Sequence, residues 1–131
     1  MNVLLIEDSK GDIFLIDSAF EELGIKYNLS VMENGKEALE YIVKAESGQA
    51  SLPAFIILDL NLPIINGFEV LERIKHSIKL KDTPVIIFSS STEEKDKARA
   101  LELGAMAYFS KPVDYDTYMT IVESFLGILD L

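Results

Sequence analysis

Short apolar runs alternate with longer amphipathic segments along the whole chain. Three runs, at residues 2–6, 54–58 and 85–88, are apolar almost throughout and are too short for ordinary helices. They predict strands buried on both faces, as in a parallel sheet covered by helices. Residues 27–32 alternate apolar and polar side chains, which is typical of an edge strand, and residues 105–109 form a short fifth run.

Between the predicted strands, apolar side chains recur at the spacing of helices. The first helix is expected over residues 10–23, with Ser9 as its cap and Gly24 as its stop. Further helices are expected over residues 36–45, over 68–78, from Thr92 to Gly104, and from Asp114 or Asp116 to about 129. Five strands alternating with five helices predict one α/β domain over residues 1–131, a doubly wound five-stranded parallel sheet. No separate output domain is expected.

The composition adds a strongly acidic balance. The 131 residues include 12 Lys and Arg against 22 Asp and Glu, a formal net charge of −10. This balance argues against nucleic acid or an anionic membrane as the main partner, because phosphate contacts need a basic patch. There is no cysteine, which is compatible with a reducing cytoplasm. The first apolar run is too short for a signal peptide or a membrane span, so a cytoplasmic protein is expected.

Candidate functional groups follow four of the five predicted strands: Glu7-Asp8, Asp59, Ser89 and Lys111. The carboxyl ends of parallel strands meet at one edge of a sheet, and in the strand order 2-1-3-4-5 these four strands are neighbours. Carboxylates held together repel one another unless a cation is present. Oxygen ligands without Cys or His suit Mg²⁺ or another hard divalent cation. With an ammonium and a hydroxyl beside them, they predict a site that holds a phosphoryl group on a carboxylate.

This arrangement resembles the receiver domain of response regulators in two-component signalling, of the chemotaxis-regulator-like, single-domain type. The resemblance covers essentially the whole chain and is carried by Glu7-Asp8, Asp59 in LDLNLP, Gly67, Ser89 in PVIIFSSS, and Lys111-Pro112 after Tyr108. It implies the flavodoxin-like (βα)5 receiver fold. It also implies a phosphoacceptor protein that catalyses only its own phosphorylation and dephosphorylation.

The resemblance further implies a role for each residue. Asp59 would accept a phosphoryl group from a histidine of a sensor histidine kinase or a phosphotransfer protein. Asp8, Asp59 and the backbone carbonyl of Asn61 would hold Mg²⁺, with Glu7 acting mainly through a water molecule. Lys111 would pair with the phosphoryl oxygens, or with Asp59 before the reaction.

The predicted output is a change at the face formed by the fourth helix, the fifth strand and the fifth helix. Ser89 would move toward the phosphoryl group and Tyr108 would rotate inward behind it, although an aromatic residue on a short strand is also compatible with simple packing. The last helix carries more apolar side chains than one buried stripe needs. This excess is compatible with a homodimer or a downstream protein target at this face, and equally with a helix end that covers the base of the sheet.

Two other functional classes use similar residues. A small phosphatase of the haloacid dehalogenase type also forms an aspartyl phosphate, but it needs an Asp two residues after the nucleophile, where this chain has Asn61. A degenerate receiver that only binds partners is expected to lack Asp59, Lys111 or an acid of the Glu7-Asp8 pair. On its own, the Glu7-Asp8 pair could also simply cap the first helix. His76, the only histidine, is expected on the surface without a role. The alternating charges of residues 93–99 are expected to form a solvated helix face.

Overall fold

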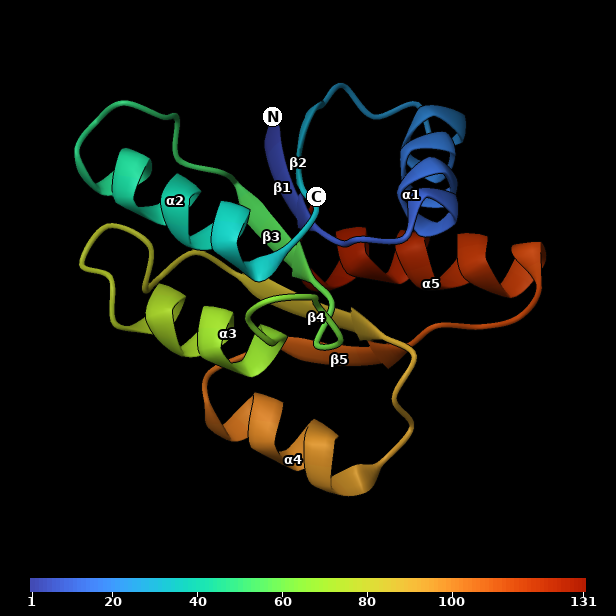
Figure 1. Ribbon diagram of the computed structural model, residues 1–131. Helices are drawn as coiled ribbons and strands as arrows, with labels where there is room; N and C mark the ends of the chain where they lie inside the picture. The colour runs from blue at the N-terminus through green and yellow to red at the C-terminus, as the bar shows by residue number, and fades with distance from the viewer.

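The chain forms a five-stranded parallel sheet with the strand order β2-β1-β3-β4-β5, as the computed structural model of residues 1–131 shows (Figure 1). The strands are β1 (Asn2–Ile6), β2 (Asn28–Met32), β3 (Phe55–Leu58), β4 (Val85–Ser89) and β5 (Ala107–Ser110). The helices are α1 (Lys10–Glu22), α2 (Gly35–Glu46), α3 (Gly67–Lys75), α4 (Glu94–Glu102) and α5 (Tyr115–Ile128). The predicted doubly wound α/β fold is confirmed.

Four of the five helices begin at a side-chain cap that the sequence supplies. The hydroxyl of Ser9 accepts the backbone N–H of Asp12 at the start of α1 (3.3 Å). Asn34, Asn66 and Asp114 cap α2, α3 and α5 in the same way. Because Ser9 is the cap of α1, as predicted, capping does not explain the preceding pair of acids.

The start of α4 differs from the prediction. The helix begins at Glu94 rather than at Thr92, and its N-cap residue Glu93 makes no side-chain cap bond. The hydroxyl of Ser91 instead accepts the backbone N–H of Glu93 (3.3 Å) and donates to the carboxylate of Asp96 (2.7 Å). These bonds hold residues 90–93 as a loop between the carboxyl end of β4 and the start of α4.

Smaller differences affect α3, α4 and β5. α3 ends at Lys75 rather than near Ile78, and β5 runs from Ala107 to Ser110 rather than over residues 105–109. On α4 only Ala100 is buried, but the guanidinium of Arg99 lies 4.2 Å from the ring centre of Phe68. The expected solvated face therefore includes one cation–π contact that joins α4 to α3.

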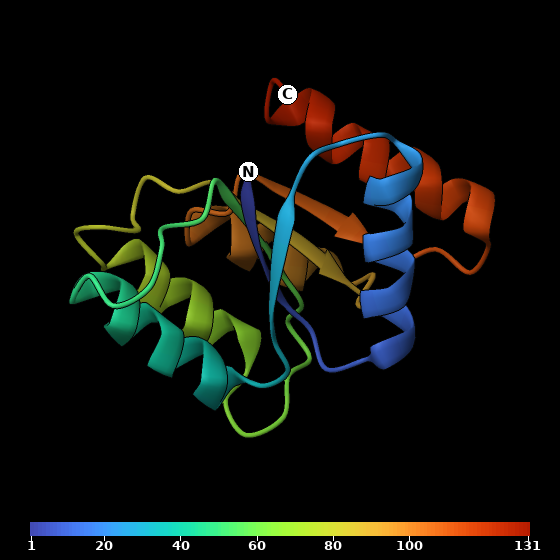
Figure 2. The same ribbon diagram turned by 90° about the horizontal axis from the view of Figure 1, so that it is seen from above.

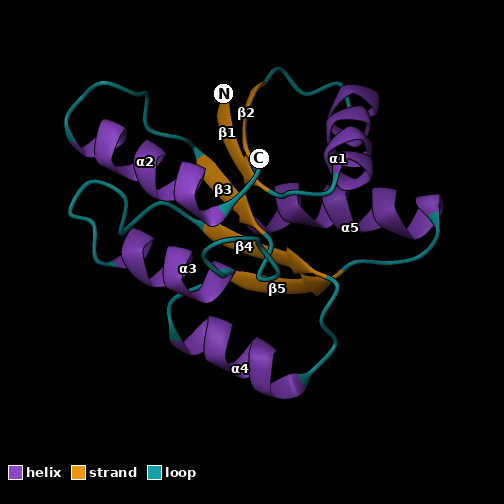
Figure 3. Ribbon diagram, in the orientation of Figure 1, coloured by secondary structure: helices purple, strands orange, loops and turns teal.

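Helices cover both faces of the sheet, with α2, α3 and α4 on one face and α1 and α5 side by side on the other (Figures 1 and 2). Figure 3 shows the strands lying between the two helix layers. Successive strand residues point to opposite faces of the sheet, so each face has its own hydrophobic core. Leu4 and Ile6 belong to the first core, under α2, α3 and α4, and Val3 and Leu5 belong to the second, under α1 and α5. The second core is rich in aromatic side chains, which pack edge to face, for example Phe88 against Phe125 (5.4 Å between ring centres).

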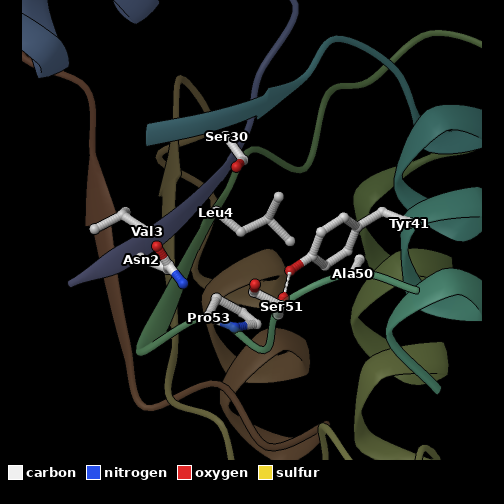
Figure 4. A pocket seen from close by; sticks show the side chains of 8 residues that line it. All are labelled: Asn2, Val3, Leu4, Ser30, Tyr41, Ala50, Ser51 and Pro53. Atoms are coloured by element: carbon white, nitrogen blue, oxygen red, sulfur yellow. Dashed lines mark hydrogen bonds between the residues drawn. The ribbon is translucent and has the colours of Figure 1, made fainter. Parts of the chain in front are cut away.

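A cavity of about 190 Å³ lies near the amino ends of the strands, at the opposite edge from the predicted site (Figure 4). It is lined by Asn2, Val3, Leu4, Ser30, Tyr41, Ala50, Ser51 and Pro53. The hydroxyl of Tyr41 already donates to the carbonyl of Ser51 inside it (2.5 Å). None of the helices in the structure is both long and apolar enough to cross a membrane.

Candidate functional site

Two buried carboxylates lie at the carboxyl ends of β1 and β3. The parallel register pairs Ile6 with Leu58, so the next residues, Glu7 and Asp59, come side by side. Glu7 and Asp59 are only 1% and 4% exposed, whereas Asp8 is exposed to solvent. Carboxylate oxygens of the three residues lie within 4.8 Å of one another. The structure therefore brings together the three acids that the sequence predicts at this edge.

Lys111, which follows β5, places its ammonium among three carboxylates. Its Nζ atom lies 2.7 Å from Glu7, 2.9 Å from Asp12 and 3.0 Å from Asp59. The contact with Asp59 is the predicted one, and the contacts with Glu7 and Asp12 are additional. Since an ammonium has three N–H donors, the three carboxylates are enough to accept all of them.

Burial and charge shift the ionisation of this cluster. Burial, followed by the charge of Asp59, raises the pKa of Glu7 from 4.5 to about 7, against the opposing effect of Lys111. Burial alone would lower the pKa of Lys111, but hydrogen bonds to Glu7 and Asp12 and the charge of Asp59 raise it above its ordinary value. Lys111 is therefore charged near neutral pH, whereas Glu7 changes its protonation there.

The donor set fits a hard divalent cation. Glu7, Asp8 and Asp59 offer only oxygen ligands, and the exposure of Asp8 leaves the cluster accessible from solvent. A cation would also relieve the repulsion that contributes to the raised pKa of Glu7. The backbone carbonyl of Asn61 stays a predicted ligand, while the N–H of Asn61 donates to Oδ1 of Asp59 (3.1 Å).

The hydroxyl of Ser89 is fully buried at the end of β4, next to β3 in the sheet. It accepts long hydrogen bonds from the side-chain amide of Asn61 (3.4 Å) and from the backbone N–H of Ser91 (3.5 Å). The same amide donates to the hydroxyl of Ser90 at 3.1 Å. Because bonds of this length are weak, the Ser89 hydroxyl is held loosely.

Tyr108 is half-buried on β5, and its hydroxyl donates to the carbonyl of Ser91 (2.8 Å). The hydroxyl of Ser110 donates to the same carbonyl oxygen (3.0 Å). β5 thus holds the loop after β4 through two hydroxyls that share one acceptor. The inward rotation of Tyr108 stays a prediction.

Two glycines hold the loop between β3 and α3 close to the site. A Cβ atom on Gly67 would lie 2.4 Å from the carbonyl oxygen of Asp59, and one on Gly35 would lie 2.2 Å from that of Ile65. Between them, Ile64 is 73% exposed and has a φ angle of 73°, which is unfavourable for a β-branched residue. The loop is tightly packed at its end and strained in its middle.

Two residues of the site region, Asp12 and Tyr118, were not predicted. Asp12 contacts Lys111 from the first turn of α1, and the hydroxyl of Tyr118 on α5 donates to the Asp12 carboxylate (3.2 Å). Asp12 lies three residues after the cap Ser9, in the first turn of a helix that starts beside the strand-end acids, and this position could have indicated it. No local pattern joins Tyr118 to a residue 106 positions earlier. His76 is exposed beyond the C-terminal end of α3, the end away from Gly67.

Comparison with known proteins identifies the family. A family model, the response regulator receiver domain, matches residues 3–123. The chain belongs to the response regulator receiver family. Such domains are response regulators of two-component systems, for which phosphorylation and Mg²⁺ binding are typical. Membership confirms the predicted family and argues against the phosphatase alternative.

Similar receiver proteins come from archaea and cyanobacteria. The probable methanogenesis regulatory protein FilR2 of Methanothrix harundinacea is 38% identical over 121 residues, which cover 92% of this chain and 78% of FilR2. The response regulator Rcp1 of Synechocystis is 34% identical over 110 residues, covering 83% of this chain and 75% of Rcp1.

Solved receiver structures share the fold. The phosphorylated cyanobacterial phytochrome response regulator RcpA has a TM-score of 0.90 and 33% identity, over 98% of this chain and 92% of RcpA. The Mn²⁺-bound form of Rcp1 has a TM-score of 0.88 and 31% identity, over 96% and 91% of the two chains. This family acts in signalling rather than in turnover of a separate substrate.

Proposed function

We propose that this receiver takes a phosphoryl group on Asp59 from a histidine of a sensor kinase or a phosphotransfer protein. The observation that carries the proposal is the environment of the Asp59 carboxylate. It is 4% exposed, one oxygen accepts the N–H of Asn61 (3.1 Å), and the other faces the ammonium of Lys111 (3.0 Å). A carboxylate held at both oxygens beside two further acids is oriented for attack on phosphorus.

The transfer exchanges one bond to phosphorus for another. A carboxylate oxygen of Asp59 forms the new P–O bond while the P–N bond to the donor imidazole breaks. The electron pair of that bond stays on the imidazole nitrogen, so the donor histidine leaves as a neutral imidazole that carries its one N–H on the other ring nitrogen. Lys111 turns N–H donors toward the phosphoryl oxygens as their charge develops near Asp59. Hydrolysis by water later returns Asp59 to a carboxylate and releases phosphate.

Mg²⁺ is the proposed cofactor, which Asp8, Asp59 and the backbone carbonyl of Asn61 would hold, with Glu7 acting mainly through a water molecule. When bound, such a cation neutralises the charge on the phosphoryl oxygens. The three clustered carboxylates support this assignment, and a relative, Rcp1, is described in a Mn²⁺-bound form. The ammonium of Lys111 contacts two of these acids, Glu7 (2.7 Å) and Asp59 (3.0 Å).

The output begins at the loop after β4. We propose that the loosely held hydroxyl of Ser89 turns to the phosphoryl group and that Tyr108 leaves the carbonyl of Ser91 to follow it inward. The face formed by α4, β5 and α5 then changes its affinity for a target or for a second copy of the chain. The three elements and the residues next to them carry exposed apolar side chains: Leu101, Met106, Val113 and Ile128.

The receiver domain formed by residues 1–131 is proposed to signal by docking to other proteins. Its net charge of −10 supports protein partners rather than nucleic acid or anionic membrane. A cytoplasmic location stays a prediction.

The test is phosphorylation by acetyl phosphate with Mg²⁺, read as intact mass, for wild type, Asp59→Asn and the matched control Asp82→Asn on an exposed turn. We expect one added phosphoryl group on wild type and on Asp82→Asn, none on Asp59→Asn, and none when the metal is chelated. Chromatography with beryllofluoride would show whether mass doubles. Phosphorylation of Asp59→Asn at the wild-type rate would contradict the assignment.

A further inference from the structure

Lys111 has an anionic partner that the proposed reaction does not use. Of its three carboxylate contacts, Glu7 and Asp59 belong to the proposed metal and phosphoryl site. Asp12, at 2.9 Å, comes from α1 and is not among the three acids clustered for a cation. During phosphoryl transfer the first two partners change their interactions, whereas Asp12 is free to keep its contact.

Asp12 is itself fixed on three sides. Its backbone N–H donates to the hydroxyl of the helix cap Ser9 (3.3 Å). One carboxylate oxygen faces Lys111, and the other accepts the hydroxyl of Tyr118 (3.2 Å), which also lies 3.3 Å from the carbonyl of Asp12. Tyr118 is 2% exposed and packs edge to face on Phe88, one residue before Ser89 (5.2 Å between ring centres).

We infer that Asp12 is a positioning residue for the phosphoryl-transfer step, which holds Lys111 in place from α1 and is itself held by Tyr118 from α5. This inference rests on the proposed function of Asp59. With Asp12 present, one N–H of Lys111 stays anchored while the other two move from carboxylates to phosphoryl oxygens. Without it, the ammonium lies closer to Glu7 and Asp59, which lowers the nucleophilicity of Asp59 and misplaces the charge needed in the transition state.

Helix α1, which carries Asp12, also offers a matched control. Tyr27 donates its hydroxyl to the carboxylate of Asp17 on α1 and to the carbonyl of Asp17 (2.9 Å), the same pair of acceptors that Tyr118 uses at Asp12. Neither Tyr27 nor Asp17 bonds to Lys111 or to the clustered acids. Asp17→Asn and Tyr27→Phe thus remove the same charge and the same hydroxyl from a tyrosine–aspartate link outside the site.

The experiment measures the rate of phosphorylation by acetyl phosphate in Mg²⁺, together with the unfolding midpoint of each protein. Asp12→Asn is expected to slow phosphorylation about tenfold, the effect of one lost hydrogen bond to a charged group. Tyr118→Phe is expected to slow it less, and the double variant no more than Asp12→Asn alone, because Tyr118 acts through Asp12. Asp12→Glu, which keeps the carboxylate, is expected to recover most of the rate.

The controls separate positioning from folding. Asp17→Asn and Tyr27→Phe are expected to phosphorylate like wild type even where they lower the unfolding midpoint. A wild-type rate in Asp12→Asn, or a rate in Asp12→Glu as low as in Asp12→Asn, would overturn the inference while leaving Asp59 as acceptor. Failure of wild type itself to take a phosphoryl group would overturn the proposed function, and this inference with it.

Discussion

The two halves of the strand-end site are built from different chemistry. The ionic half consists of Glu7, Asp8, Asp59 and Lys111: the ammonium of Lys111 makes short contacts with Glu7 and Asp59, and Asp8 lies in the same carboxylate cluster. The hydroxyl half consists of Ser89, Ser91, Tyr108 and Ser110, which are joined by hydrogen bonds of neutral groups. A buried charge that loses its partner is strongly destabilising, whereas a neutral hydrogen bond contributes little net energy. The first half is therefore suited to fixing reactants and the second to moving.

Loss of the ammonium is the strongest way to test the ionic half. Lys111→Met leaves two buried carboxylates without a cation, so we expect the free energy of unfolding at pH 8 to fall by about 3 kcal/mol without metal. Lys10→Met breaks an exposed pair with Glu33 and is expected to change it by no more than about 0.5 kcal/mol. Urea unfolding with a chelator measures both. Equal losses would show that burial of the cluster does not matter.

The raised pKa of Glu7 predicts a pH dependence in the same half. The folded protein holds the Glu7 proton more tightly than the unfolded chain, so the free energy of unfolding should fall as pH rises from 4.5 to about 7. The expected contribution is about 1–3 kcal/mol over this window. It should disappear in Glu7→Gln and persist in Glu40→Gln, which changes an exposed acid on α2. An unchanged profile in Glu7→Gln would assign the titration to other groups.

The hydroxyl half should tolerate single changes. Tyr108→Phe leaves Ser110 on the carbonyl of Ser91, and Ser110→Ala leaves Tyr108, so each is expected to cost less than about 1 kcal/mol. The double variant leaves this carbonyl without either donor and should cost more than the sum. Hydrogen exchange of the backbone amides at residues 89–93 reports the loop directly. If the cost of the double variant equalled the sum of the two single costs, the two hydroxyls would not substitute for one another at the carbonyl of Ser91.

Much of the ionic half could be predicted from the sequence because it lies where strands end. The apolar run before Asp59 marks the strand, and the parallel register places Asp59 beside Glu7 without knowledge of any side-chain contact. Lys111 follows β5 by the same logic. The approach of Lys111 to Asp59 (3.0 Å) was implied by the resemblance to receivers. The particular roles of these residues in catalysis and metal binding stay predictions.

The remaining contacts depend on how helices and loops are placed, which no local pattern determines. Asp12 meets Tyr118 only because α1 and α5 lie side by side on one face of the sheet. The carbonyl of Ser91 meets Tyr108 and Ser110 only because residues 90–93 form a loop rather than the first turn of α4. The predicted start at Thr92 was wrong because Ser91 uses its hydroxyl on Asp96 and Glu93.

The separation of the two cores by the sheet has a consequence for how the sequence can diverge. Leu4 packs only with the side of α2, α3 and α4, and Val3 only with the side of α1 and α5. Substitutions on the two sides should therefore accumulate independently, with compensating changes confined to one side. Lys111 is different, since its contacts reach α1 as well as the ends of β1 and β3. At strand-end residues of this kind, a substitution on one side of the sheet should require a compensating substitution on the other.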